Sequence, residues 1–218
     1  DDLLEVIGQF GNDCAPPAST LAMNELRTNH SGVDTNEYIE IAGTPGDSLD
    51  GYSWIIIGDG LGDSPLGHLE TVICLDGQVI GSNGYYSQIL ENVFENNDPV
   101  THLLVRGLNV PESCNLNGTV DLDFDDDGTL DSTPWEEVVD CVALIGIGED
   151  EVVYCDVTIG PDDIYTAVGG YRCPDLTGDW VMAPFDLGCL DTPGEANACN
   201  QDDADADGVP DCADNCVN

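Results

Sequence analysis

Basic residues are almost missing from this chain of 218 residues. It contains no lysine, and its three cations, Arg27, Arg106 and Arg172, lie far apart, whereas aspartate and glutamate together number 44. The formal net charge is -41 at pH 7. Because phosphate groups are bound by clustered lysines and arginines, this composition excludes nucleic acid and anionic membrane surfaces as partners.

Long hydrophobic runs and zinc-type spacings are missing as well. No segment approaches the roughly 18 apolar residues of a membrane span, so we expect none. The ten cysteines include no C-x-x-C pair, and the three histidines are isolated. An even number of cysteines without metal spacing predicts disulfides in an oxidising compartment. The first residues lack the basic start of a signal peptide, which favours a mature secreted form, extracellular or at the cell surface.

The apolar residues, 41% of the chain, fall in short β-branched stretches separated by 25 glycines and 12 prolines. This pattern predicts an all-β fold. Asp-Gly or Asn-Gly pairs at 50–51, 76–77 and 83–84 supply tight turns. One segment, 87–96, also has the spacing of a short helix. Strands are expected at residues 3–9, 20–27, 37–41, 52–58, 69–75, 78–80, 85–89, 102–106, 138–147, 151–157 and 180–182.

Four short elements follow one another along the chain: an Asn-Glu strand at 21–27, D-T-N-E-Y-I-E-I at 34–41, L-D-G-Y-S-W at 49–54 and D-T-P-G-E-A-N at 191–197. Together they resemble the lamin-tail domain family. The resemblance implies an immunoglobulin-like β-sandwich over residues 20–198, in a family without shared catalytic residues. Residues 1–19 form an N-terminal extension. Its apolar strand, 3–10, either adds to an edge of its own sheet or is donated to a neighbouring molecule.

The composition changes after residue 198, and residues 199–218 form a third segment rich in aspartate. Residues 203–216 resemble a thrombospondin type-3 calcium repeat. Calcium takes six to eight oxygen ligands, and alternate aspartates around a glycine turn converge on one point. The alternative is an acidic solvated tail. The main predicted calcium ligands are Asp203, Asp205, Asp207, the Val209 carbonyl, Asp211 and Asp214.

A weaker copy of this motif lies at residues 123–131. Its twelfth position is Pro134, which offers no side-chain ligand, so Glu136 or Glu137 would have to fold back to complete the shell. The alternative is an acidic hairpin loop that uses its Asp-Gly pair as a turn. The ligands predicted for this second calcium are Asp123, Asp125, Asp127, the Thr129 carbonyl and Asp131.

Catalysis is not expected. Residues 46–49 spell the Gly-Asp-Ser-Leu string of a family of serine esterases, but a serine nucleophile needs a base, and no histidine follows His102. For the disulfides, local candidates are Cys141 with Cys155 across a hairpin, and Cys173 with Cys189. The cysteines at 14, 199, 212 and 216 lie at or beyond the edge of the sandwich and are available to bridge subunits.

Three functions fit these observations. The favoured one is a non-catalytic extracellular structural module that binds calcium and assembles head to tail with its own copies into a filament or surface layer. The second is an accessory binding or targeting domain of a larger secreted enzyme, such as a nuclease. The third is a halophilic protein whose acids serve only hydration, which the clustering of acids at 121–131 and 202–214 disfavours.

Overall fold

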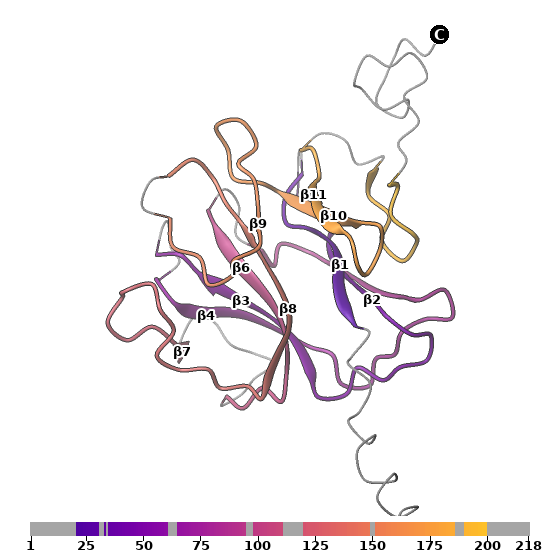
Figure 1. Ribbon diagram of the computed structural model, residues 1–218, viewed down its shortest axis with the longest axis horizontal. Coiled ribbons are helices and arrows are strands. Elements are labelled where there is room, and N and C mark those ends of the chain that lie inside the picture. The colour runs from indigo at the N-terminus through magenta and orange to yellow at the C-terminus, as the bar shows by residue number, and fades with distance from the viewer. Residues whose placement is uncertain are drawn as a thin grey trace, which may run out of the picture.

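The computed structural model describes residues 21–30, 33, 35–60, 65–94, 98–110, 120–148, 151–185 and 190–199. Within these residues eleven strands form two sheets, and there is no helix (Figure 1). The prediction of an all-β fold is confirmed, and two packed sheets are consistent with a β-sandwich. The predicted strand at 3–10 and the aspartate-rich segment after residue 199 lie outside the described residues.

The first sheet is antiparallel throughout. Its order is β11 (Asp179–Met182), β10 (Gly169–Cys173), β1 (Ala22–Arg27), β2 (Glu37–Ala42) and β5 (Tyr85–Leu90). The second sheet ends in one parallel pair, between β8 and β9. Its order is β7 (Val120–Asp121), β4 (His68–Cys74), β3 (Tyr52–Gly58), β6 (Val100–Arg106), β8 (Glu137–Leu144) and β9 (Thr158–Ile159).

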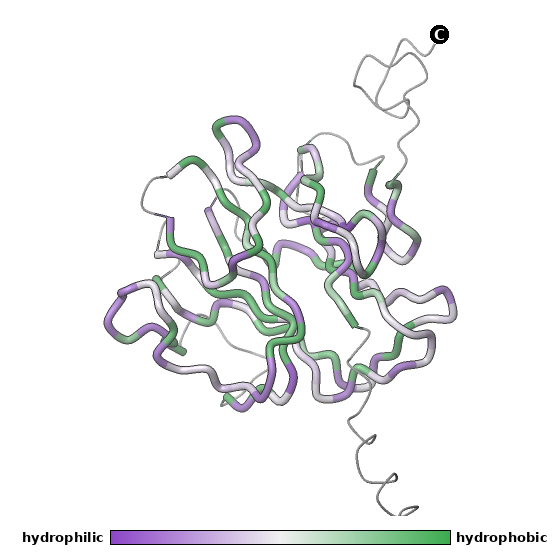
Figure 2. Tube along the Cα trace, viewed as in Figure 1, coloured by the Kyte–Doolittle hydropathy of each residue, from purple (hydrophilic) through white to green (hydrophobic). Residues whose placement is uncertain are grey.

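The second sheet is buried on both faces. Trp54 and Ile56 of β3 pack toward the first sheet, in one core with Met23 and Ile39. The alternate residues Ile55 and Ile57 belong to a second core on the outer face, together with the loop residue Leu122. Two buried faces account for the uninterrupted apolar run of β3. Figure 2 shows that hydrophobic stretches lie mainly in the strands.

The outer face of the first sheet is buried but polar, and residues 190–199, here called the closing segment, cover it. Glu25 and Glu40 are almost fully buried there. The Thr192 hydroxyl donates to Glu25 Oε2 at 2.8 Å, and the Gly194 amide donates to Glu40 Oε2 at 2.5 Å. The disulfide between Cys173 of β10 and Cys199 ties down the end of this segment. Buried carboxyl groups are tolerated here because their oxygens accept hydrogen bonds.

Three predicted elements are wrong. Residues 151–157 form no strand, and 78–80 make only an isolated bridge from Val79 to Ser48. The helix considered at 87–96 is not formed, because residues 85–90 pair with β2 as strand β5. The strand β10 was not predicted, since two glycines lower its strand propensity. They are required by close packing: a Cβ on Gly169 would lie 2.2 Å from the Leu26 carbonyl oxygen.

The disulfide predictions are half right. Cys141 and Cys155 are bonded, as their short separation suggested, although the segment carrying Cys155 is not the second arm of a hairpin. Cys173 is bonded to Cys199, so its predicted pairing with Cys189 is wrong. Cys199 is therefore not available to bridge subunits. The closing segment returns over the first sheet and brings Cys199 to the end of β10, although Cys189 is nearer to Cys173 in sequence.

Candidate metal-binding loop

Residues 123–131 form a loop whose two ends meet on the second core. Leu122 is fully buried in that core. Its amide donates to the Gly67 carbonyl at 3.0 Å. Its carbonyl accepts from the amides of Asp131, at 2.8 Å, and Ser132, at 3.0 Å. The base of the loop is thus fixed to the sheet, and the acidic residues Asp125, Asp126, Asp127 and Asp131 are exposed.

The buried carboxylate of Asp123 organises the loop from inside. Its Oδ1 accepts from the Asp127 amide at 3.2 Å, and its Oδ2 accepts from the Gly128 amide at 2.9 Å. The hydroxyl of Tyr154 also donates to Oδ2, at 2.8 Å. Tyr154 is itself held in place, because its amide donates to Thr101 Oγ1 and the next residue is in the disulfide with Cys141.

Two residues of the loop have positive φ angles, 56° at Asp126 and 83° at Gly128. Aspartate and glycine are the residue types that adopt this conformation at low cost. A Cβ on Gly128 would lie 3.3 Å from Val152. The Asp-Gly pair at 127–128 therefore forms a turn, as the motif predicts, and the turn packs against the segment that carries Tyr154.

Three carboxylates meet at the loop. Asp123, Asp125 and Asp131 each offer an oxygen, and these oxygens all lie within 4.8 Å of one another. Among the described residues, this is the one group of three or more aspartate, glutamate, histidine or cysteine side chains close enough to share a metal ion. Carboxylate oxygens at this spacing match what a hard divalent cation such as Ca²⁺ or Mg²⁺ requires. The structure thus brings together three of the side chains predicted as ligands of the second calcium.

Asp127, also predicted as a ligand, is not part of this group. Its Oδ1 accepts from the Thr129 amide at 2.9 Å, so it stabilises the turn. The Thr129 carbonyl remains a predicted ligand. Glu137 does not fold back to the loop, because it lies in β8 and pairs with Arg106 at 2.9 Å. Asp203, Asp205, Asp207, Val209, Asp211 and Asp214 lie outside the described residues.

In the part of the chain that the structure describes, no ion pair involves a carboxylate of residues 123–131. The neighbouring carboxylate of Asp127 raises the pKa of Asp125, with further contributions from desolvation, Asp131 and Asp123. All three arginines of the sequence are engaged with carboxylates elsewhere: Arg27 with Asp191, Arg106 with Glu137 and Arg172 with Asp140. A bound cation would relieve the repulsion among the loop carboxylates, which no arginine of this chain is placed to do.

Two features of the site could not be read from the motif. Tyr154 is 31 residues from Asp123, and no local pattern links them. Gly67 is a second case: with φ of 67°, it lets the loop approach so closely that a Cβ there would lie 2.4 Å from the Asp123 Cβ. Each contact depends on how β4 and the segment after β8 pack against the loop.

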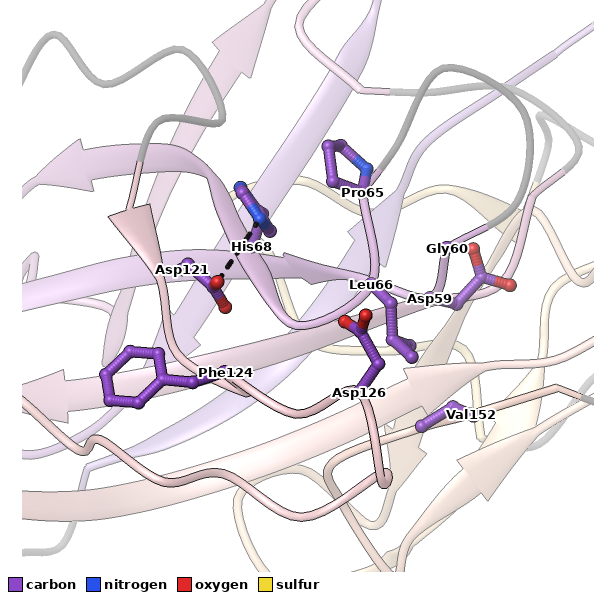
Figure 3. A pocket seen from close by; sticks show the side chains of 9 residues that line it. All are labelled: Asp59, Gly60, Pro65, Leu66, His68, Asp121, Phe124, Asp126 and Val152. Carbon is purple, nitrogen blue, oxygen red and sulfur yellow. Dashed lines mark ion pairs between the residues drawn. The ribbon is translucent and has the colours of Figure 1, made fainter.

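A pocket of about 470 Å³ lies beside the loop (Figure 3). Acidic, apolar and aromatic side chains contribute to its wall. His68 Nε2 is 3.9 Å from Asp121 Oδ2 across part of it. The lining residues are Asp59, Gly60, Pro65, Leu66, His68, Asp121, Phe124, Asp126 and Val152.

The residues considered for catalysis have structural contacts. Ser48 Oγ accepts from the Asp50 amide at 3.1 Å, in a turn. His102 is fully buried between Trp54 and Phe94. Its Nδ1 accepts from the Trp54 indole at 3.1 Å, and burial lowers its pKa to about 3. His102 is therefore a neutral core residue at ordinary pH.

Comparison with protein-family models, curated proteins and solved structures gave no match to this chain. In the part of the chain that the structure describes, no helix is long and apolar enough to cross a membrane. The disulfides Cys141–Cys155 and Cys173–Cys199 are compatible with an extracellular protein.

Proposed function

We propose that this chain is a non-catalytic, extracellular calcium-binding structural module, with residues 123–131 as one calcium site. The observation that carries the proposal is the convergence of Asp123, Asp125 and Asp131, whose carboxylate oxygens lie within 4.8 Å of one another. The loop backbone is already held by hydrogen bonds to Asp123. A site arranged before the ion arrives loses little conformational entropy on binding.

Within this proposal, the sandwich is of the immunoglobulin-like lamin-tail type. Support comes from contacts between the residues that carry the resemblance. Thr192 of the terminal element donates to Glu25 of the first element, and the Asn197 side chain donates to the Asn24 carbonyl at 3.2 Å. Gly194 donates to Glu40 of the second element. The three elements thus share one polar network on the first sheet.

The calcium site is tested by titrating the purified chain with Ca²⁺ in a calorimeter. Asp125→Asn removes the negative charge of one ligand and keeps the size of the side chain. We expect it to weaken calcium binding at this site by more than about tenfold, because a charge-assisted contact is lost. Asp126→Asn is the matched control. It removes the same charge from the adjacent residue, which is outside the three-carboxylate group and whose positive φ asparagine also accepts.

Equal losses in the two variants would mean that calcium responds only to overall charge, and the proposed site would be rejected. The segment at 203–214 is followed separately with Asp207→Ala. If the segment at 203–214 also binds a calcium ion, the stoichiometry should fall by one in this variant. Protease should then cleave residues 201–216 in calcium as readily as it does in chelator. Loss of the ion at 203–214 would leave the result for Asp125 unchanged.

Self-assembly is a second part of the proposed function, favoured by the edge of the first sheet. Strand β5 pairs with β2 on one side, and no described strand pairs with it on the other. Its sequence, Y-Y-S-Q-I-L, has no charge, and Ile89 is 54% exposed. Uncharged edge strands accept added strands. Deleting residues 1–13 should abolish calcium-dependent oligomers in sedimentation; unchanged oligomers would refute donation of strand 3–10.

A further inference from the structure

Glu25 of β1 and Glu40 of β2 lie directly opposite each other on neighbouring strands of the first sheet. They are register partners in this antiparallel pair, and they are only 1% and 0% exposed. Like charges at opposed positions of a sheet repel each other, and burial raises the cost of each charge further. Two full negative charges here are therefore costly unless a cation lies beside them.

No arginine neutralises this pair of glutamates. The sequence has no lysine, and each of its three arginines forms an ion pair with a different carboxylate. Most of the neighbouring ionisable groups are acidic, so they do not offset a second negative charge. These neighbours are Arg27 of β1, Tyr38 of β2, Tyr85 of β5, Asp175 between β10 and β11, and Asp191 and Glu195 of the closing segment.

The closing segment covers the pair and depends on it for its own contacts. The amide and the hydroxyl of Thr192 both donate to Glu25, the hydroxyl at 2.8 Å. The Gly194 amide donates to Glu40 Oε2 at 2.5 Å. The end of the segment is held beside β10 by the disulfide of Cys199. Lifting the segment would therefore expose both carboxyl groups to water while the chain stays attached at that end.

Burial raises the pKa of Glu25 and raises that of Glu40 to about 8, although hydrogen bonds from Asn24 and Gly194 to Glu40 act in the opposite direction. The covered pair thus retains a proton at a pH where glutamates in water have lost theirs. We propose that the closing segment is a pH-dependent latch, which is closed while the pair of Glu25 and Glu40 holds a proton and opens locally as the pH rises.

The direction of the effect follows from the number of bound protons. From pH 4.5 to about 8 the closed form holds up to one proton more than the open form, in which water reaches both glutamates. The equilibrium constant for opening should therefore rise with pH by up to about tenfold per unit. At lower pH both forms are protonated, and opening should become independent of pH.

The latch is tested by amide hydrogen exchange of the full chain, with its disulfides intact and at constant calcium, from about pH 5 to 9. The protection factor, corrected for the intrinsic pH dependence of exchange, should fall for the Gly194 amide by up to about tenfold per pH unit up to pH 8. It should stay below that of the Ile55 amide in β3, because the opening is local. Protection of Gly194 that is independent of pH, or equal to that of Ile55, would refute the latch.

Two variants assign the effect to the pair. Glu25→Gln removes the opposed charge, and its new amide nitrogen has an acceptor in the Thr192 hydroxyl, which lies 2.8 Å from Glu25 Oε2. Near pH 8 it should protect the Gly194 amide about threefold better than the wild type, because a cross-strand repulsion is relieved. The double variant, which adds Glu40→Gln, has no ionisable group at the pair. Its Gly194 protection should lose the pH dependence, whatever its level, and a retained slope contradicts the proposal.

Glu195→Gln is the matched control, because it removes an exposed charge from the same closing segment. It should leave both the protection of Gly194 and its pH dependence unchanged. If it protects Gly194 as much as Glu25→Gln does, overall charge controls the segment and the latch is wrong. Calcium binding enters none of these outcomes, so this proposal and the proposed function can fail separately.

Discussion

The ion pair between Arg27 and Asp191 is the sharpest test of how the closing segment is held. Arg27 is 1% exposed and Asp191 11% exposed, so both charges are largely removed from water. Arg27 Nε donates to Asp191 Oδ1 at 2.7 Å, Nη2 donates to the same oxygen, and Nη1 donates to the Pro184 carbonyl at 3.3 Å. Asp191→Asn leaves the buried guanidinium without its counter-charge.

The expected cost follows from the burial. Removing one partner of a buried pair destabilises a protein by about 3–5 kcal/mol, because the remaining charge stays desolvated without compensation. For a chain of this size, that corresponds to a fall in Tm of roughly 10 °C. Replacing both residues with apolar side chains, Arg27→Met with Asp191→Leu, removes the unpaired charge as well. We expect the double variant to be more stable than the sum of the two single losses predicts.

The assay is urea unfolding with the disulfides intact, followed by tryptophan fluorescence. It is run on the wild type, on Asp191→Asn, on the single variants Arg27→Met and Asp191→Leu, and on the double variant. Limited proteolysis near residue 190 reports separately whether the closing segment has detached. A loss below about 1 kcal/mol for Asp191→Asn, a value typical of exposed pairs, would show that the segment is not bound to the sheet in this way. Strictly additive losses in the cycle would also refute the reasoning.

Two further predictions concern the same face of the first sheet. Burial raises the pKa of Glu40 from its ordinary 4.5 to about 8, against the opposing hydrogen bonds from Asn24 and Gly194. Between these pH values the folded state retains a proton that the unfolded chain has lost. The free energy of unfolding should therefore fall as pH rises, by up to ~1.4 kcal/mol per pH unit. Glu40→Gln should flatten this pH profile in urea titrations at pH 5–8, and an unchanged slope would refute the assignment. Asn197→Ala should cost about 2 kcal/mol in the same assay, because its amide donates to the Asn24 and Arg172 carbonyls and both are left without that donor; a loss within error would contradict a holding role.

The candidate site shows where local pattern suffices and where it fails. The motif at 123–131 correctly predicted a turn at Asp127-Gly128, because glycine after aspartate is favoured where φ is positive. It also predicted ligands at both Asp127 and Asp131. Asp131 lies in the group of three carboxylates, whereas Asp127 Oδ1 accepts from the Thr129 amide in the turn. Which of several equivalent aspartates faces inward depends on how the loop is held against the second sheet.

The sequence by itself determined the all-β class, most of the long strands and the disulfide between Cys141 and Cys155, because these depend on local backbone preference and short chain separations. Only the tertiary structure decided the features that depend on the path of the chain. Three features each join segments that are distant in sequence, and no nearby sequence pattern identifies the partner. They are the disulfide of Cys173 with Cys199, the contact of Tyr154 with Asp123 and the burial of Glu40. Their physical cause is the packing of the closing segment and the acidic loop against opposite sheets, which supplies desolvation and donors that no short window of sequence contains.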